Sequence, residues 1–157
     1  MILSGPMGND QVPKKLLVVD NARVILDLLE LVLSREGYQV TTTPCSDEVV
    51  GLTSREGFDL AIVDVGLRRG NGRTLMKMIR EASPETPIVV MTGYPTEEIT
   101  RIAQRHAQGY LEKPFALQEL LAVVRCAIEE RLMYTRKARV GPAPASIAAP
   151  LCPQGAA

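Results

Sequence analysis

The stretch Leu16-Leu17-Val18-Val19-Asp20-Asn21 sets the fold class of this chain. Four consecutive apolar residues are typical of a short strand that is buried on both faces, as in a parallel sheet covered by helices. The run stops at a carboxylate and an amide, so two polar side chains follow the predicted strand directly. The flanking sequence is therefore expected to supply more strands that pair with this one and helices that cover it.

The chain after Asn21 alternates between helical patterns and short apolar runs. Ser46 and Asp47 are candidate caps of the second helix, and Thr96 with the acidic residues after it begins the fourth. Strands are expected at 16–19, 38–42, 58–63, 88–91 and 110–112, and helices between 25 and 37, between 46 and 57, over 72–82, from 95 onwards and from 117 past 128. Five strand–helix units predict a three-layer α/β domain, because right-handed crossovers place helices on both faces of a parallel sheet.

Polar side chains follow four of the predicted strands. Asp20 and Asn21 follow the first, Asp64 the third, Thr92 the fourth and Lys113 the fifth. Each residue alone is weak evidence, since Asp is a common turn residue and Lys is usually a solvated surface charge. Ligands and chemistry collect at the carboxyl ends of strands in open α/β sheets. The full set therefore predicts one site.

Together with their neighbours, these residues resemble the receiver domain of bacterial response regulators. The matching segments are 17–21, 59–64, 90–93 and 110–115, with Gly72, inside a span of roughly 14–128. The resemblance implies a doubly wound (βα)5 fold with a five-stranded parallel sheet in the order 2-1-3-4-5. It also implies that a sensor histidine kinase or phosphotransfer protein phosphorylates the domain, which then changes its binding to a protein target or output domain.

The resemblance assigns the chemistry to particular residues. Asp64 would be the phospho-acceptor, and Lys113 would pair with the phosphoryl group. Asp20, Asn21, Asp64 and the carbonyl of Gly66 would bind the cofactor, Mg²⁺. These roles agree with the needs of phosphoryl transfer, which are an in-line nucleophile and positive charge facing the phosphoryl oxygens.

The same resemblance implies a switch. Thr92 would bind a phosphoryl oxygen, and Tyr110 would turn inward behind it. An ordinary, partly buried strand residue is an equally good interpretation of Tyr110. The Lys113–Pro114 bond is expected to be cis. An extension of the last helix past Ile128 leaves a homodimer through the last helices open, beside the simpler interpretation that its apolar residues are core.

Two of the positions that depart from the family pattern bear on function. Asn21 stands where the family usually has a second acidic residue, and an amide oxygen carries no charge, so weaker Mg²⁺ binding is expected. Arg68 replaces a usual Pro, and with Arg69 it makes the loop after Asp64 more basic; solvated charges are favoured over contact with an acidic partner. The Asn21 substitution keeps a second function open, a degenerate receiver that binds partners without phosphorylation.

Enzyme functions are disfavoured. A small Mg²⁺-dependent hydrolase would need a substrate lid, for which the short predicted loops leave little material. A kinase is excluded by the lack of a Gly-rich nucleotide loop, and His106, the only histidine, is expected at the surface. The sequence therefore favours a switch protein that is not an enzyme.

Composition gives the remaining expectations. The 18 basic and 18 acidic residues leave no excess positive field for direct binding of nucleic acid. Three cysteines without metal-ligand spacing, no signal-peptide pattern and no long apolar run indicate a cytoplasmic protein without membrane insertion. Gly- and Pro-rich ends predict a flexible N-terminus (1–13), a receiver domain (14–137) and a disordered tail or linker (138–157).

Overall fold

Strands and helices alternate along the whole described chain. A computed structural model describes the backbone of residues 12–66 and 72–140 and the side chains of residues 12–66 and 73–130. The elements are β1 (Lys15–Val19), α1 (Arg23–Arg35), β2 (Gln39–Thr43), the 3₁₀ helix η1 (Ser46–Glu48), α2 (Val49–Arg55), β3 (Leu60–Asp64), α3 (Gly72–Ala82), β4 (Ile88–Thr92), α4 (Glu97–His106), β5 (Gly109–Glu112) and α5 (Leu117–Val140).

The five strands form one parallel sheet in the order β2-β1-β3-β4-β5. This confirms the predicted three-layer, doubly wound (βα)5 fold and its strand order, 2-1-3-4-5. The register pairs Val63 with both Val19 and Val90, so β1, β3 and β4 end at nearly the same level. The residues that follow these strands are thereby brought to one edge of the sheet.

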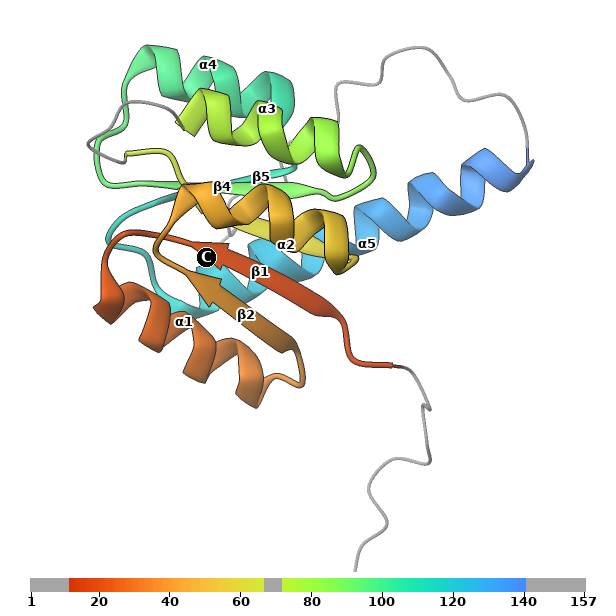
Figure 1. The fold of residues 1–157 in the computed structure, drawn as a ribbon, viewed down its shortest axis with the longest axis horizontal. Coiled ribbons are helices and arrows are strands. Elements are labelled where there is room, and N and C mark those ends of the chain that lie inside the picture. Colours follow the sequence, from red (N-terminus) through yellow and green to blue (C-terminus); the bar gives the residue numbers. More distant parts are fainter. Residues whose placement is uncertain (1–11, 67–71, 141–157) are drawn as a thin grey trace, which may run out of the picture.

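Helices cover both faces of the sheet. α1 and α5 lie on one face, and α2, α3 and α4 lie on the other (Figure 1). Neighbouring strand residues point to opposite sides, so Leu16 and Val18 pack against the first pair of helices while Leu17 and Val19 pack against the second group. All four side chains are fully buried, as the unbroken apolar run of β1 predicts.

The predicted caps of the second helix are wrong. Ser46 and Asp47 lie inside η1, and neither η1 nor α2 has a side-chain cap at its N-terminus. Thr43, the last residue of β2, organises this turn instead: its hydroxyl accepts a hydrogen bond from the Cys45 amide at 3.1 Å and donates one to Glu48 Oε2 at 2.8 Å. Because the chain first makes a 3₁₀ turn, α2 begins only at Val49.

Two other helix ends match the sequence. The Thr96 hydroxyl caps α4 by accepting a hydrogen bond from the Ile99 amide at 3.2 Å. Gly37 follows α1 with a φ of +93°, a left-handed conformation that glycine adopts without strain. The amides of Gly37 and Tyr38 donate to the carbonyls of Ser34 and Leu33, which is the Schellman arrangement at a helix end.

The last helix is longer than the core that it covers. α5 runs to Val140 and projects beyond the body of the domain (Figure 1). The predicted tail from residue 138 thus begins within this helix, and its remainder, 141–157, lies outside the described residues, as do residues 1–11 and the loop with Arg68 and Arg69. Among the described helices, none has the length and hydropathy to cross a membrane.

Candidate functional site

Four of the predicted site residues gather at the carboxyl edge of the sheet. Asp20 and Thr92 are fully buried, Asp64 is 6% exposed, and the Lys113 side chain is 20% exposed. Strand pairing continues to this edge, because the Asp20 amide donates to Thr43 and the Lys113 amide donates to Thr92. The sheet itself therefore fixes where these side chains start.

The Lys113 ammonium joins the two carboxylates. Its Nζ lies 2.6 Å from Asp20 Oδ2 and 2.9 Å from Asp64 Oδ2, although these residues are 93 and 49 positions away along the chain. Both contacts are charge-assisted hydrogen bonds in a mostly buried environment. The predicted convergence of Asp20, Asp64 and Lys113 is confirmed, and the Lys113–Pro114 peptide bond is cis, as expected.

Backbone amides hold the other oxygen of each carboxylate. The Ala22 amide donates to Asp20 Oδ1, and the Gly66 amide donates to Asp64 Oδ1, both at 2.8 Å. Each is a bond to the residue two positions on, the turn that Asp favours after a strand. Both carboxylates are thus fixed in orientation by one backbone and one ammonium donor.

The electrostatics of the cluster favour a charged lysine. Burial of the Lys113 ammonium would by itself lower its pKa, but hydrogen bonds to Asp20 and Asp64 and the negative charges of both outweigh burial. The pKa of Lys113 is therefore raised above its usual value. Counted at their formal charges, Asp20, Asp64 and Lys113 carry one excess negative charge, which can attract a further cation.

Gly66 leaves space between Asp64 and Thr92. A Cβ atom at Gly66 would lie 3.2 Å from Asp64 Oδ1 and 3.6 Å from Thr92 Oγ1. The Asp64 carboxylate and the Thr92 hydroxyl thus face the same small volume, which a larger residue would partly fill. The Thr92 hydroxyl accepts a hydrogen bond from the Tyr94 amide at 3.0 Å, so its own proton is available for donation.

The oxygen atoms at this edge suit a hard divalent cation, but only two of the residues that supply them carry a negative charge. Asp20 and Asp64 supply carboxylate oxygens, and Asn21 and the Gly66 carbonyl can add neutral oxygens, all of them donors that Mg²⁺ accepts. Asn21 is exposed beside the buried Asp20. No three His, Cys, Asp or Glu side chains of residues 12–66 and 73–130 are grouped as a metal site would require. A metal here would depend on two carboxylates.

Tyr110 lies inside the domain, next to α4. Its side chain is 7% exposed in the core on the α3 and α4 face, and its hydroxyl donates to Glu112 Oε1 at 3.3 Å. Burial is the main cause that raises the pKa of Tyr110; a hydrogen bond with Thr100 acts in the opposite direction, and Glu112 adds to the rise. The ring is therefore already turned inward in this conformation.

One aromatic residue near the site, Tyr94, was not predicted from the sequence. Tyr94 is 77% exposed, and its ring carbon Cδ2 would lie 4.0 Å from a Cβ atom at Gly66. The ring therefore flanks the opening between Asp64 and Thr92. Its position two residues after Thr92 was the only hint in the sequence that it lies near the site. A tyrosine in a loop after a strand is otherwise indistinguishable from an ordinary surface tyrosine. His106 is exposed, as expected, and lies away from this cluster at the end of α4.

Comparison with known proteins agrees with this geometry. Residues 16–125 match the family described as the response regulator receiver domain. The chain is 33% identical over 107 residues to the response regulator SaeR of Staphylococcus epidermidis, a match that covers 68% of this chain and 46% of that protein. The chain therefore spans about half the length of this curated relative.

Solved structures show the same fold. A CheY-like response regulator receiver domain protein from Methanospirillum hungatei superposes with a TM-score of 0.74 at 27% identity, covering 78% of this chain and 98% of that one. A response regulator from Burkholderia pseudomallei, solved with a phosphorylated aspartic acid, a calcium ion and citrate, gives a TM-score of 0.66 at 29% identity, covering 82% of this chain and 75% of that one. With a family match over most of its length and this fold, the chain belongs to the response regulator receiver domain family.

Proposed function

We propose that the chain accepts a phosphoryl group on Asp64 from a histidine kinase or phosphotransfer protein, with Mg²⁺ as the cofactor. The observation that carries the proposal is the Lys113 ammonium placed between Asp20 and Asp64 at the end of the sheet. The Burkholderia pseudomallei relative supports it, because its structure contains both a phosphorylated aspartic acid and a calcium ion.

The reaction would be a simple displacement at phosphorus. One Asp64 oxygen forms the new P–O bond while the bond from phosphorus to the donor nitrogen breaks, and the donor keeps that electron pair. Lys113 faces the negative charge of the transferred group, and the open side of Gly66 leaves room for it to approach. The Thr92 hydroxyl can donate its proton to a phosphoryl oxygen.

Mg²⁺ would be held by Asp20, Asp64, the Asn21 amide oxygen and the Gly66 carbonyl. When bound, it would neutralise negative charge on the phosphoryl oxygens. The excess charge of the cluster supports a cation here, while the neutral Asn21 supports weaker binding than a third carboxylate would give.

Signalling would follow from contacts that exist only in the phosphorylated state. A charge-assisted hydrogen bond from Thr92 to the phosphoryl group would favour a conformation in which the loop before α4 has moved. Tyr110 already points inward, so phosphorylation would not need to turn its ring. It would instead alter the hydrogen bonds of the Tyr110 hydroxyl with Thr100 and Glu112. The surface formed by α4, β5 and α5 would then bind a protein target or output domain differently, without enzymatic turnover of a substrate.

A small phosphodonor tests the proposal directly. The protein is incubated with acetyl phosphate and Mg²⁺, and its intact mass is measured for the wild type and for Asp64→Asn. We expect the wild type alone to gain one phosphoryl group, and chelation of Mg²⁺ to abolish the gain. An unchanged wild-type mass, with acetyl phosphate and with a phosphorylated histidine donor, would instead support the degenerate receiver that the Asn21 substitution leaves open.

A further inference from the structure

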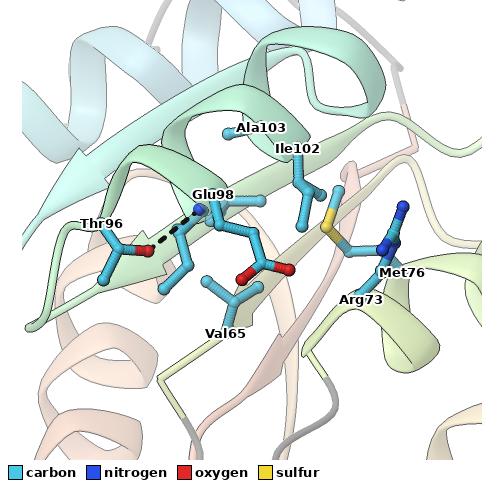
Figure 2. Close-up of a pocket in the computed structure, with 9 residues that line it drawn as sticks. Val65, Arg73, Met76, Thr96, Glu98, Ile102 and Ala103 are labelled. Carbon is cyan, nitrogen blue, oxygen red and sulfur yellow. Dashed lines mark hydrogen bonds between the residues drawn. The ribbon is translucent and has the colours of Figure 1, made fainter.

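A groove between α3 and α4 takes no part in the proposed phosphorylation site. Near the carboxyl edge of the sheet it opens into a cavity of about 300 Å³. Its apolar lining consists of Val65, Met76, Val90, Ile99, Ile102 and Ala103. Figure 2 shows Val65, Met76 and Ile102 turned towards this common space. Only Ala103 of α4 is fully buried, so the helix leaves an apolar space beneath it.

The groove continues towards the far end of both helices. A second cavity of about 230 Å³ shares Arg73, Met76 and Ile102 with the first and reaches Arg80 and His106. From Glu98 to His106, α4 advances about 12 Å at about 1.5 Å per residue. A cavity of about 300 Å³ lies at the lower end of the range that is typical of small-ligand sites.

The far end of the groove is positively charged. Arg73, Lys77 and Arg80 follow one another at helical spacing on α3, and all three line the second cavity. The only ion pair that they form among the described residues is Lys77 with Glu81, at 3.9 Å and largely exposed. Arg73 lies in the first turn of α3 and also lines the first cavity, so the far end itself is lined by two cations, Lys77 and Arg80, of which only Lys77 is paired with a carboxylate.

Arg80 is the most informative of these cations. Its guanidinium donates to the carbonyls of His106 at 2.5 Å and Pro84 at 3.4 Å, and burial lowers the pKa of Arg80. Carbonyl groups accept the hydrogen bonds but do not neutralise the charge. A partly buried cation without a carboxylate partner among the described residues is stabilised by an anion.

Glu98 fixes the direction in which an anionic ligand would lie. Its carboxylate borders the first cavity and points across it towards Met76 and Arg73 (Figure 2). At this end Glu98 would repel an anionic head and offset the charge of Arg73, whereas a head at the other end would face Arg80 and Lys77. The apolar part would then occupy the cavity beneath α4.

From this arrangement we propose that the groove binds a free, small amphiphile with one anionic head and an unbranched apolar chain. The head contacts Arg80 and Lys77, and the chain extends past Met76 and Ile102 towards Val65. This inference goes beyond the proposed phosphorylation and does not depend on it. Octanoate, which combines a carboxylate with a short chain, is a suitable probe.

Binding is measured by titrating octanoate into the full chain while recording methyl NMR signals of Met76, Ile99 and Ile102. We expect saturable shifts at these methyl groups, and a dissociation constant about tenfold or more higher for 1-octanol, which has no charge. Arg80→Gln should weaken octanoate binding by a similar factor. Because Arg80 also bonds to α4, Lys77→Gln, at a largely exposed side chain, serves as the second variant and should weaken binding severalfold.

Arg105→Gln is the matched control, because Arg105 is exposed on α4 and lines neither cavity. It should leave the octanoate affinity unchanged, and Asp64→Asn should do the same, which separates this test from that of phosphorylation. Equal affinity for octanol and octanoate, no effect of both Arg80→Gln and Lys77→Gln, or shifts only outside the groove would overturn the proposal. Binding to anionic phospholipid vesicles without any response to dispersed octanoate would also overturn it, in favour of a membrane surface.

Discussion

Replacing Lys113 with methionine removes the ammonium that joins two buried carboxylates. Methionine keeps most of the apolar stem, so the change isolates the charge and its hydrogen bonds. Asp20 is fully buried and Asp64 nearly so, and each loses a contact of 2.6 or 2.9 Å. Each carboxylate keeps one backbone donor, from Ala22 or Gly66. The variant therefore leaves two negative charges close together with no cation between them.

The expected loss is large. Removing one partner of a buried ion pair costs about 3–5 kcal/mol, because the remaining charge stays buried without compensation. We expect Lys113→Met to lower the free energy of unfolding by about 3 kcal/mol or more, since the side chain is only 20% exposed. Urea unfolding at neutral pH, with a chelator present, measures this difference from the shift of the midpoint at constant slope.

Lys77→Met is the matched control, because it is the same substitution in a lysine whose pair with Glu81 is 3.9 Å long and mostly exposed. That variant should change the free energy of unfolding by less than about 0.5 kcal/mol. Adding Asp64→Asn to Lys113→Met should restore part of the stability, since it removes one of the two opposed charges. The reasoning is refuted if Lys113→Met and Lys77→Met have the same small effect, or if Asp64→Asn does not restore stability to the Lys113→Met protein.

Three further predictions follow from individual contacts. Asn21→Asp adds a carboxylate beside Asp20, and calorimetric titration should show about tenfold tighter Mg²⁺ binding; an unchanged affinity would contradict the charge argument. Gly109→Ala places a Cβ 2.6 Å from a Val123 methyl, so it should cost about 1–3 kcal/mol of unfolding free energy in urea, which Val123→Ala should partly recover; additive effects would contradict the clash. The raised pKa of Tyr110 means that its contribution to stability is complete below about pH 10 and is lost as pH rises through its folded-state pKa. The difference in phenolate absorbance between wild type and Tyr110→Phe should therefore appear above the ordinary range of tyrosine.

Much of the proposed site could be predicted because a parallel sheet sorts residues by position in the chain. A residue at the end of a strand or directly after it reaches the same edge. Correct strand ends were therefore enough to place Asp20, Asp64, Thr92 and Lys113 together. The apolar runs gave those ends within a residue or two. The proximity of these four side chains thus follows from the sheet topology, which the alternation of strand and helix patterns along the sequence predicts.

The features that were not predicted from the sequence arise from competition between neighbouring polar residues or from contacts between distant segments. Ser46 has a hydroxyl that could cap a helix. The hydroxyl of Thr43, at the end of β2, instead makes the hydrogen bonds of this turn, with the Cys45 amide and Glu48 Oε2. Arg80 reaches the carbonyl of His106, 26 positions away, and nothing in α3 alone indicates this. Propensity and periodicity describe one segment at a time, so such competition between segments is visible only in the folded chain.

Charge balance links the departure at Asn21 to the geometry around Lys113. Asp20, Asp64 and Lys113 form a compact cluster with a formal net charge of minus one. Each carboxylate also accepts a hydrogen bond from a backbone amide. A third carboxylate at position 21 would leave two excess negative charges. Their repulsion would destabilise the folded domain more strongly unless a divalent cation were bound. The amide at Asn21 would therefore lower the affinity for Mg²⁺ and raise the stability of the metal-free domain. The same missing charge would weaken the attraction of the ion and relieve repulsion between Asp20 and its neighbours.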